Sequence, residues 1–368
     1  MNLRTLLSDT LAGHRLTPAE GRRLLGSTGQ DILAIAGAAD EAREDRVGDR
    51  VTYVRNQNLH VTNVCKNLCG FCGFGRPKGA PGTYCFGKDE VQRRARLAVE
   101  RGVTEICPLS GVHPDFTLES YEDLVGWIRE VAPGVDIHFC SPEEVSFVAA
   151  RAGIPVREVL GRLREAGLGT LQGTAAEILV DRVRAVICPT KCDTATWLDV
   201  IREAHGMGIR STATIMYGAG ETGTDRIVHL DLLRGLQDET GGFTELVPMS
   251  WIHQNTPLYR SGRAPAGATG REDVLLIATA RLYLDNFDHI QVSWGKVGLK
   301  MASVLLLSGG DDLGGTMFED AVSVDAGAGE ASYLDPSEMG RIANDLGRRL
   351  CWRSTTYEIL DEGPPPRP

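Results

Sequence analysis

The chain has 368 residues, of which 42% are hydrophobic and 24% are charged, and its net charge is −10. This composition is ordinary for a globular enzyme, and no basic tract is concentrated enough to follow a phosphate backbone, so we expect no nucleic acid as a partner. Polar residues interrupt every apolar run before it could span a bilayer, and the N-terminus lacks a signal-peptide pattern, so we expect a cytoplasmic protein with no membrane partner.

Residues 1–50 form the first predicted segment, a helical lead-in. Apolar residues recur there near the helical period, and Thr17 followed by Pro18 is typical of a helix start. From residue 51 onward, short β-rich runs alternate with amphipathic helical patterns. This order indicates βα units around a parallel sheet.

Eight candidate strands predict a TIM-type (β/α) barrel over residues 51–320, closed or nearly closed. The strands are expected at 59–62, 105–109, 136–139, 168–171, 210–216, 244–248, 290–293 and, more weakly, 312–313. Helices between them are expected at 89–101, 118–131, 142–152, 156–166, 196–207 and 225–240. Reactive groups of such a barrel belong at the carboxyl ends of the strands.

Two further regions follow from composition. Residues 261–270 are rich in Gly, Ala and Pro and predict a mobile loop. Residues 321–361 predict a helical C-terminal extension, with its last helix at 337–350, and residues 362–368 predict a flexible, proline-rich tail.

Three cysteines directly after the first predicted strand are the strongest chemical signal. Cys65, Cys69 and Cys72 have the spacing to bind three irons of a [4Fe–4S] cluster, which leaves the fourth iron open to a small molecule. A zinc site is the alternative, with Cys85 as a fourth ligand. Nine cysteines without disulfide-scaffold spacing agree with a reducing compartment.

Several residues after later strands are candidates for binding a cofactor, and each has a structural alternative. Ser110 and Gly111 let the backbone approach a ligand, or simply form a turn. Glu177 suits a ribose diol or an ammonium, or the start of a helix. Arg184 suits a carboxylate or a surface position, and Met216 an adenine ring or the core.

Polar residues also gather near the predicted strand ends, where they would converge if the barrel is right. Each one alone is more often structural, but together they predict a pocket for a substrate with many hydrogen-bonding groups. The candidates for catalysis and substrate contact are His113, Asp115, Glu245, His253 and Lys296.

These stretches together resemble the radical SAM superfamily and, within it, the branch of FO synthase subunit 2 (CofH), which is related to aminofutalosine synthase (MqnE) and dehypoxanthine futalosine cyclase (MqnC). The resemblance runs from about Asn58 to Tyr357. Its blocks are the cysteine motif at 61–72, GVHPDF at 111–116, IHFCSP at 137–142, GTLQGTAAEIL at 169–179, TATIMYG at 212–218, GGFTELVP at 241–248, QVSW at 291–294 and DLGGT at 312–316.

The resemblance implies a transferase that cleaves S-adenosylmethionine (SAM) reductively to a 5′-deoxyadenosyl radical, which takes hydrogen from tyrosine. A hydroxybenzyl fragment then joins a ribitylaminouracil on the path to a deazaflavin coenzyme. An external donor such as flavodoxin or ferredoxin would supply the electron. The implied cluster ligands are Cys65, Cys69 and Cys72, and the cofactor-binding residues are Phe71, Ser110, Gly111, Glu177, Arg184 and Met216.

Two other functions remain open at this point. One is a related radical SAM enzyme that acts on another substrate, by adenosyl addition or cyclisation, in menaquinone or specialised metabolism. The other is a metal-binding scaffold without radical chemistry.

Overall fold

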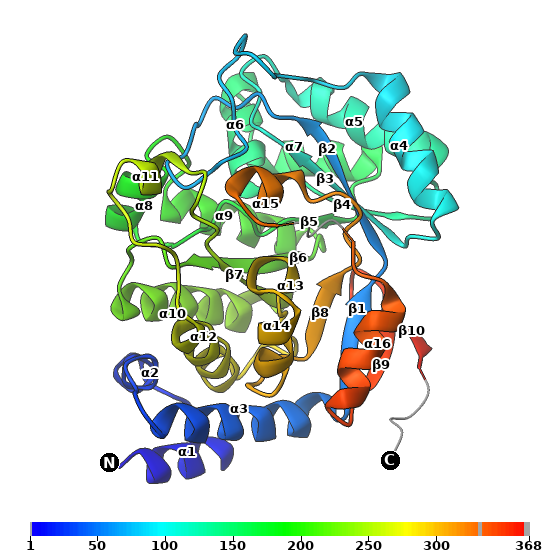
Figure 1. The fold of residues 1–368 in the computed structure, drawn as a ribbon. Helices are drawn as coiled ribbons and strands as arrows, with labels where there is room; N and C mark the ends of the chain where they lie inside the picture. The colour runs from blue at the N-terminus through cyan, green and yellow to red at the C-terminus, as the bar shows by residue number, and fades with distance from the viewer. Residues whose placement is uncertain (1, 330–332, 364–368) are drawn as a thin grey trace.

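The computed structural model describes residues 2–329 and 333–363. Helices α1 (Leu3–Leu11), α2 (Pro18–Leu25) and α3 (Asp31–Val47) come first and lie together at the lower end of the molecule (Figure 1). Helix α2 starts at the predicted signal: the Thr17 hydroxyl accepts from the Glu20 amide, and the Glu20 carboxylate accepts from the Thr17 amide. The predicted helical lead-in is confirmed.

Parallel strands form the centre of the molecule. A six-stranded sheet has the order β2-β3-β4-β5-β6-β7, and a four-stranded sheet has the order β10-β9-β1-β8. The first sheet contains β2 (Asn56–Thr62), β3 (Glu105–Ser110), β4 (Asp136–Phe139), β5 (Thr170–Leu171), β6 (Ser211–Tyr217) and β7 (Phe243–Ser250). The second contains β1 (Arg50–Val54), β8 (Asp312–Gly315), β9 (Arg349–Arg353) and β10 (Ile359–Glu362).

Backbone hydrogen bonds join the two sheets into a nearly closed barrel. The amide of Gln291 donates to Leu246 O over 2.9 Å, and the amide of Val292 donates to Asp312 O over 2.7 Å, which links β7 to β8. On the other side, the amide of Asn58 in β2 donates to Met317 O over 2.9 Å. The predicted TIM-type barrel is confirmed in this nearly closed form.

One predicted strand, at 290–293, is reduced to isolated bridges at Ile290 and Gln291. It is short because helix α13 (Trp294–Val297) begins directly after it. Strand β1 was not predicted, and it runs into β2 with only Arg55 between them.

Helices that follow the strands cover the outside of the barrel (Figure 1). They are α4 (Lys88–Glu100), α5 (Leu118–Val131), α6 (Pro142–Ala152), α7 (Val156–Ala166), α8 (Asp181–Ile187), α9 (Thr194–Gly206), α10 (Gly223–Thr240), α11 (Pro257–Arg260), α12 (Gly270–Tyr283), α13 and α14 (Leu299–Leu306). The predicted bounds of α5, α6 and α7 are confirmed. Helix α6 shows why, since Ser141 caps its start and Gly153, in the left-handed conformation, ends it.

The C-terminal extension contains strands as well as helices. Helices α15 (Ala321–Ala326) and α16 (Pro336–Asp345) are followed by β9 and β10, which were not predicted. The helix expected at 337–350 is therefore too long: Gly347 adopts a φ of 67°, and β9 then pairs in parallel with β1. Residues 364–368 of the predicted tail lie outside the described residues, and the mobility of the 261–270 loop stays a prediction.

A buried ionic network fills the end of the barrel where the strands begin. Arg353 Nε lies 2.5 Å from Asp312 Oδ2, at the start of β8, and the Tyr357 hydroxyl donates to Glu245 Oε2 over 2.9 Å. Arg353 is 2% exposed, so it contributes its charge in a place that water does not reach. The ionic network closes this end of the barrel. A ligand-binding site is therefore expected at the opposite end, where the strands have their carboxyl ends.

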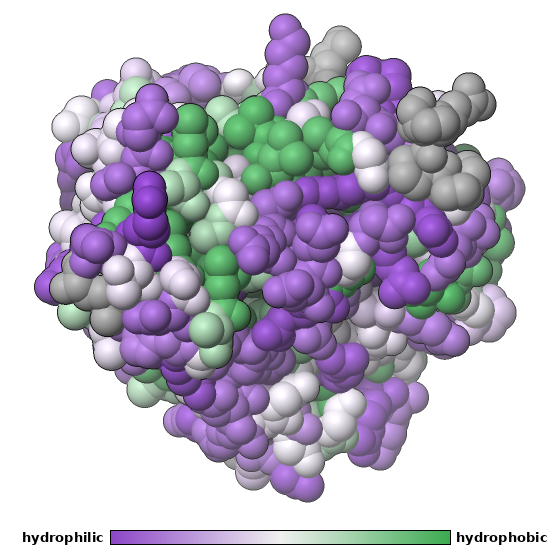
Figure 2. Space-filling view, turned by 90° about the horizontal axis from the view of Figure 1, so that it is seen from below, coloured by the Kyte–Doolittle hydropathy of each residue, from purple (hydrophilic) through white to green (hydrophobic). Residues whose placement is uncertain are grey.

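Figure 2 shows the lower face of the molecule, which is mostly hydrophilic, with hydrophobic residues in several places and most densely toward one edge. Within residues 2–329 and 333–363, no helix is both long and apolar enough to cross a membrane.

Candidate active site

A cavity of about 500 Å³ lies at the carboxyl ends of the strands. Residues that follow β2, β3, β4 and β5 line it, as do the ends of β6 and β7, which is the placement expected for a site in a barrel of this type. Much of its wall is apolar and comes from Phe71, Phe74, Met216, Met249 and Trp251. Such a wall excludes water and offers flat surfaces to an aromatic ligand.

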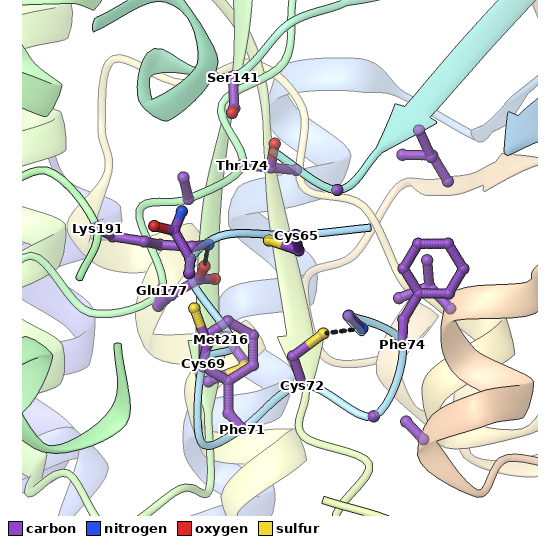
Figure 3. Close-up of a pocket in the computed structure, with 18 of the residues that line it drawn as sticks. Cys65, Cys69, Phe71, Cys72, Phe74, Ser141, Thr174, Glu177, Lys191 and Met216 are labelled. Carbon is purple, nitrogen blue, oxygen red and sulfur yellow. Dashed lines mark hydrogen bonds and ion pairs between the residues drawn. The ribbon is translucent and has the colours of Figure 1, made fainter. Parts of the chain in front are cut away.

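Cys65, Cys69 and Cys72 all line this cavity, and in Figure 3 their side chains surround one space. Backbone bonds fix the loop that carries them: the Cys65 amide donates to Arg76 O over 2.9 Å, and the Arg76 amide donates to Asn63 O over 2.8 Å. The Gly75 amide also donates to Cys72 Sγ over 3.5 Å. We call residues 63–76 the cysteine loop.

The donor set fits an iron–sulfur cluster better than zinc. Among the described residues, no group of three or more His, Cys, Asp or Glu side chains is arranged around a single metal ion. Cys85 is exposed and outside the cavity lining, in an antiparallel bridge with Thr62. Zinc needs its ligands around one ion, whereas the thiolates of a [4Fe–4S] cluster each bind a different iron.

Gly111 lets strand β3 end directly against the cysteine loop. A Cβ atom at this position would lie 2.4 Å from Val64 O and 3.0 Å from Cys65 Cβ, so no larger residue fits without moving the loop. Ser110 and Gly111 both line the cavity, beside the cysteines. The sequence analysis predicted both.

Glu177 faces the cavity from the turn after β5 and is buried. Lys191 Nζ lies 2.5 Å from Glu177 Oε1 and 5.2 Å from the centre of the Phe71 ring. Figure 3 shows both charged groups, with Met216, on the same side of the cavity as Cys69. Burial lowers the pKa of Lys191, but the charge of Glu177 outweighs it and holds this pKa well above its usual value.

Lys191 was not predicted, because it follows α8 in a loop with no local signal of function. Only the folded chain brings it to Glu177, fourteen positions away. Burial also raises the pKa of the Cys69 thiol, and the Lys191 charge opposes that rise. The ammonium is therefore an electrostatic partner of the thiols as well as of the carboxylate.

Arg184 does not lie in the cavity lining, although the sequence analysis placed it among the cofactor-binding residues. Its guanidinium donates to the carbonyl oxygens of Ala176 and Cys192, each over 2.5 Å, and of Ala175 over 3.2 Å. It thereby fixes the turn that presents Glu177. Its donors are directed to backbone carbonyls and not to a ligand.

Two acidic residues at the start of α6 line the cavity and were not predicted. Glu143 accepts from Asn67 Nδ2 over 2.7 Å and from the Cys192 amide over 2.6 Å, so it ties the cysteine loop to the loop after α8. Glu144 closes the cap of α6, and burial raises its pKa to about 7. The Ser-Pro-Glu-Glu sequence is typical of a helix start. It gives no signal that the two glutamates also line a cavity.

Of the residues predicted for substrate contact, only Lys296 lines the cavity. Its ammonium lies 3.2 Å from Asp320 Oδ2 and also contacts Ser323 Oγ. His113 stacks on Phe116 beyond the lining, with ring centres 4.8 Å apart. Asp115 is exposed and paired with Lys78, and the half-buried His253 packs edge-on against Tyr259.

Glu245 lies at the opposite end of its strand from the cavity. It is the third residue of β7, whereas Met249 and Ser250 at the end of the strand line the site. Burial, reinforced by the charge of Asp312, raises the pKa of Glu245 to about 8, although Arg353 and the Tyr357 hydroxyl oppose this rise. The structure thus places Glu245 in the ionic network and not beside a substrate.

Comparison with known proteins decides the family. Residues 59–233 match the family model of the radical SAM superfamily, and residues 240–363 match that of the CofH/MqnC C-terminal region. The chain is also 60% identical, over 97% of its own length and 98% of the relative's, to the 5-amino-6-(D-ribitylamino)uracil–L-tyrosine 4-hydroxyphenyl transferase of Methanoculleus marisnigri. The chain belongs to the radical SAM superfamily. This membership implies a [4Fe–4S] cluster and SAM as cofactors.

Other radical SAM relatives agree. The transferase of the same name from Methanosphaerula palustris is 56% identical over 97% of this chain and 98% of the relative. FO synthase of Mycobacterium tuberculosis is 40% identical over 97% of this chain, which spans 42% of that longer protein.

Solved structures support the fold. The hydrogenase maturase HydG has a TM-score of 0.76 at 16% identity, covering 98% of this chain and 78% of that one. Methylornithine synthase has a TM-score of 0.71 at 18% identity, covering 93% of this chain and 96% of that one.

Proposed function

We propose that the chain transfers the hydroxyphenyl-bearing fragment of L-tyrosine to 5-amino-6-(D-ribitylamino)uracil. The observation that carries this proposal is the 60% identity to a transferase of that name over nearly the whole of both chains. Both family regions contribute residues to the cavity lining. The cytoplasm, whose reducing conditions keep cysteines free, is the compartment that we predict.

Cys65, Cys69 and Cys72 would hold the cluster, because they are the thiols that share the cavity. When bound, the cluster and SAM supply a 5′-deoxyadenosyl radical that removes a hydrogen atom from the substrate. The backbone at Ser110 and Gly111 closely approaches the cysteine loop, which suits contact with the amino-acid part of SAM.

Glu177 and Lys191 would bind the polar groups of SAM. A carboxylate accepts hydrogen bonds from a ribose diol or an ammonium, and a lysine ammonium attracts a carboxylate. Both side chains are largely buried, with exposed fractions of 5% and 14%, so their charges act with little screening by water. Phe71 and Met216 line the same part of the cavity and would pack on the adenine ring.

Lys296 would contact the substrate. Asp320 and Ser323 hold its ammonium at the wall of the cavity that the C-terminal family region supplies. The position is fixed, and the ammonium can donate to a carbonyl oxygen of the uracil or to the phenol oxygen of tyrosine. The apolar wall around it keeps water away from reactive species.

Product analysis with substrate omission tests the proposal. Reconstituted, reduced protein is incubated without oxygen with SAM, tyrosine and the ribitylaminouracil, and the products are separated by mass. The proposal predicts a hydroxybenzyl adduct of the uracil only when both substrates are present. If 5′-deoxyadenosine forms only at a slow, substrate-independent rate and no adduct appears, the chain uses its radical on another substrate.

A further inference from the structure

The proposed function, on which this inference rests, requires an electron from outside the protein for each reductive cleavage of SAM. We propose that the surface formed by the cysteine loop, α8 and α11 docks a small acidic one-electron carrier protein of the flavodoxin class. We call this surface the docking face. It consists of Lys66, Leu68, Arg182, Val186, Tyr259, Arg260 and Arg263.

Backbone contacts make the docking face one continuous surface. The Gly70 amide in the cysteine loop donates to Ile187 O at the end of α8 over 2.9 Å, and the Leu258 amide in α11 donates to Gly70 O over 2.8 Å. The Arg263 amide donates to Leu258 O over 3.1 Å, so this arginine, which follows α11, stays with the group. Figure 1 shows α8 and α11 beside each other at one edge of the barrel.

Three large side chains of this surface are exposed. Leu68 is 48% exposed, Val186 46% and Tyr259 37%, although each belongs to a residue type that is normally buried. Leu68 lies between Cys65 and Cys69 in the sequence and also lines the cavity. An electron that enters at Leu68 therefore starts next to the cluster ligands.

The docking face is positive although the chain as a whole is negative. In segments 65–75, 181–192 and 254–263, the exposed charged residues are one acidic residue, Asp181, and four cations, Lys66, Arg182, Arg260 and Arg263. Arg182 is 64% exposed, and Arg260 and Arg263 are exposed as well. The net charge of −10 repels an acidic partner protein from most of the surface. The positive docking face attracts that partner and so determines where it binds.

Arg263 is the cation that is best placed to meet a partner. Among the described residues its side chain has no hydrogen bond or ion pair, whereas Arg260 donates to Asn255 and Arg182 pairs with Asp225. An unpaired, exposed arginine can form bidentate contacts with the carboxylates of an acidic protein. Transient redox complexes bury little surface, so a few apolar contacts with a ring of charges are enough.

The redox step is a single outer-sphere transfer. One electron leaves the reduced carrier, which is oxidised by one electron, and enters the [4Fe–4S] cluster, which is reduced by one electron. No bond breaks and no proton moves in this step. The docking face contributes position and attraction, and it takes no part in the later chemistry.

The test uses the double variant Arg260→Glu/Arg263→Glu in the reconstituted protein. Reduction of the cluster by an acidic reduced flavodoxin is followed by absorbance in stopped flow, without tyrosine or uracil, so the result does not depend on the proposed substrates. The same measurement with dithionite bypasses docking. Affinity for oxidised flavodoxin, measured by calorimetry, gives a readout apart from electron transfer.

The matched control is Arg4→Glu/Arg22→Glu, which changes the net charge equally at exposed positions of α1 and α2. We expect the docking-face variant to lose on the order of tenfold in the flavodoxin rate at low ionic strength, with the loss shrinking in high salt. Its dithionite rate and the rates of the control should be unchanged. A second variant, Val186→Glu, should weaken flavodoxin binding by placing a negative charge at an exposed apolar position of the docking face.

The proposal is overturned if the flavodoxin rate and affinity are the same in the docking-face variants and the control. It is also overturned if the dithionite rate falls as much as the flavodoxin rate, because the arginines would then support the cluster site itself. Failure to form the uracil adduct with either reductant would instead count against the proposed function.

Discussion

Lys191 Nζ lies 2.5 Å from Glu177 Oε1, and both residues line the cavity that contains the three cysteines. This pair brings a positive and a negative group to the place where the family's cofactors would bind. Because both side chains are buried, each charge depends on the other for its stability.

Lys191→Met should destabilise the folded protein by about 3–5 kcal/mol, because it leaves the Glu177 charge buried without a partner. Affinity for SAM should fall as well, and calorimetry on the reconstituted protein measures it. Lys191→Arg is the matched control, since it keeps the positive charge. Equal stability and SAM affinity in Lys191→Met and the parent protein would contradict the role of the pair.

Glu177→Gln should weaken SAM binding and leave the iron content unchanged, because Glu177 faces the cavity but is not a cluster ligand. Iron analysis and a SAM titration separate the two effects. An unchanged SAM affinity would rule out a contact between Glu177 and SAM.

Cys69→Ala should abolish both the cluster and the formation of 5′-deoxyadenosine, because a cluster with one of three ligands removed is not retained. Cys85→Ala is the matched control, since Cys85 is exposed and outside the cavity. Iron and sulfide analysis with the visible spectrum measures the cluster. Metal loss in the Cys85 variant would revive the zinc alternative, and a normal cluster in the Cys69 variant would refute Cys69 as a cluster ligand.

Gly111→Ala should displace the cysteine loop, because its new Cβ would lie 2.4 Å from Val64 O. We expect a loss of about 1–3 kcal/mol in the free energy of unfolding, together with a lower iron content. Gly126→Ala, in the middle of α5, is the control because a Cβ there meets nothing within 4 Å. If both variants load iron equally well, the close approach at Gly111 does not matter for the cluster.

The folded protein should lose stability as the pH falls from about 6.5 to 4. Burial lowers the pKa of His138 and of His205 to about 4, and that of His229 to about 3, from 6.5. A depressed pKa means that the unfolded chain takes up protons first, so stability is full above pH 6.5 and is lost in acid. The loss should reach about 3 kcal/mol for each such histidine.

His229 gives the clearest test of this pH dependence. Its Nδ1 accepts from the Leu179 amide over 2.9 Å, so protonation of Nδ1 breaks that bond. Denaturant unfolding at several pH values should show a shallower acid loss in His229→Gln than in the parent. The exposed-site control His14→Gln should keep the parent slope, and equal slopes in all three proteins would refute the assignment.

The sequence predicted those parts of the fold and site that depend on short stretches of chain. Helices α5, α6 and α7 have their own periodicity and caps, and the cysteine motif has its own spacing. Strand β9 was missed because Arg349–Arg353 is a short run of three apolar residues between two arginines, which shows no strand alternation, and it acquires its place by pairing with β1.

Long-range contacts explain the remaining differences at the site. Lys191 reaches Glu177 only in the folded barrel, and Arg184 is close in sequence to Glu177 but directs its donors to carbonyl groups. Glu245 was assigned to the cavity because it is polar and near a strand end. It is at the wrong end, where Arg353 from the C-terminal extension reaches it.

Isotope tracing tests the central claim most directly. The reconstituted protein, reduced without oxygen, is given SAM, ribitylaminouracil and tyrosine with a carbon-labelled ring, and the adduct is weighed by mass spectrometry. Our account predicts a uracil adduct heavier by the full mass of the ring label, formed together with 5′-deoxyadenosine. An adduct that lacks the label, or 5′-deoxyadenosine with no adduct at all, would contradict it.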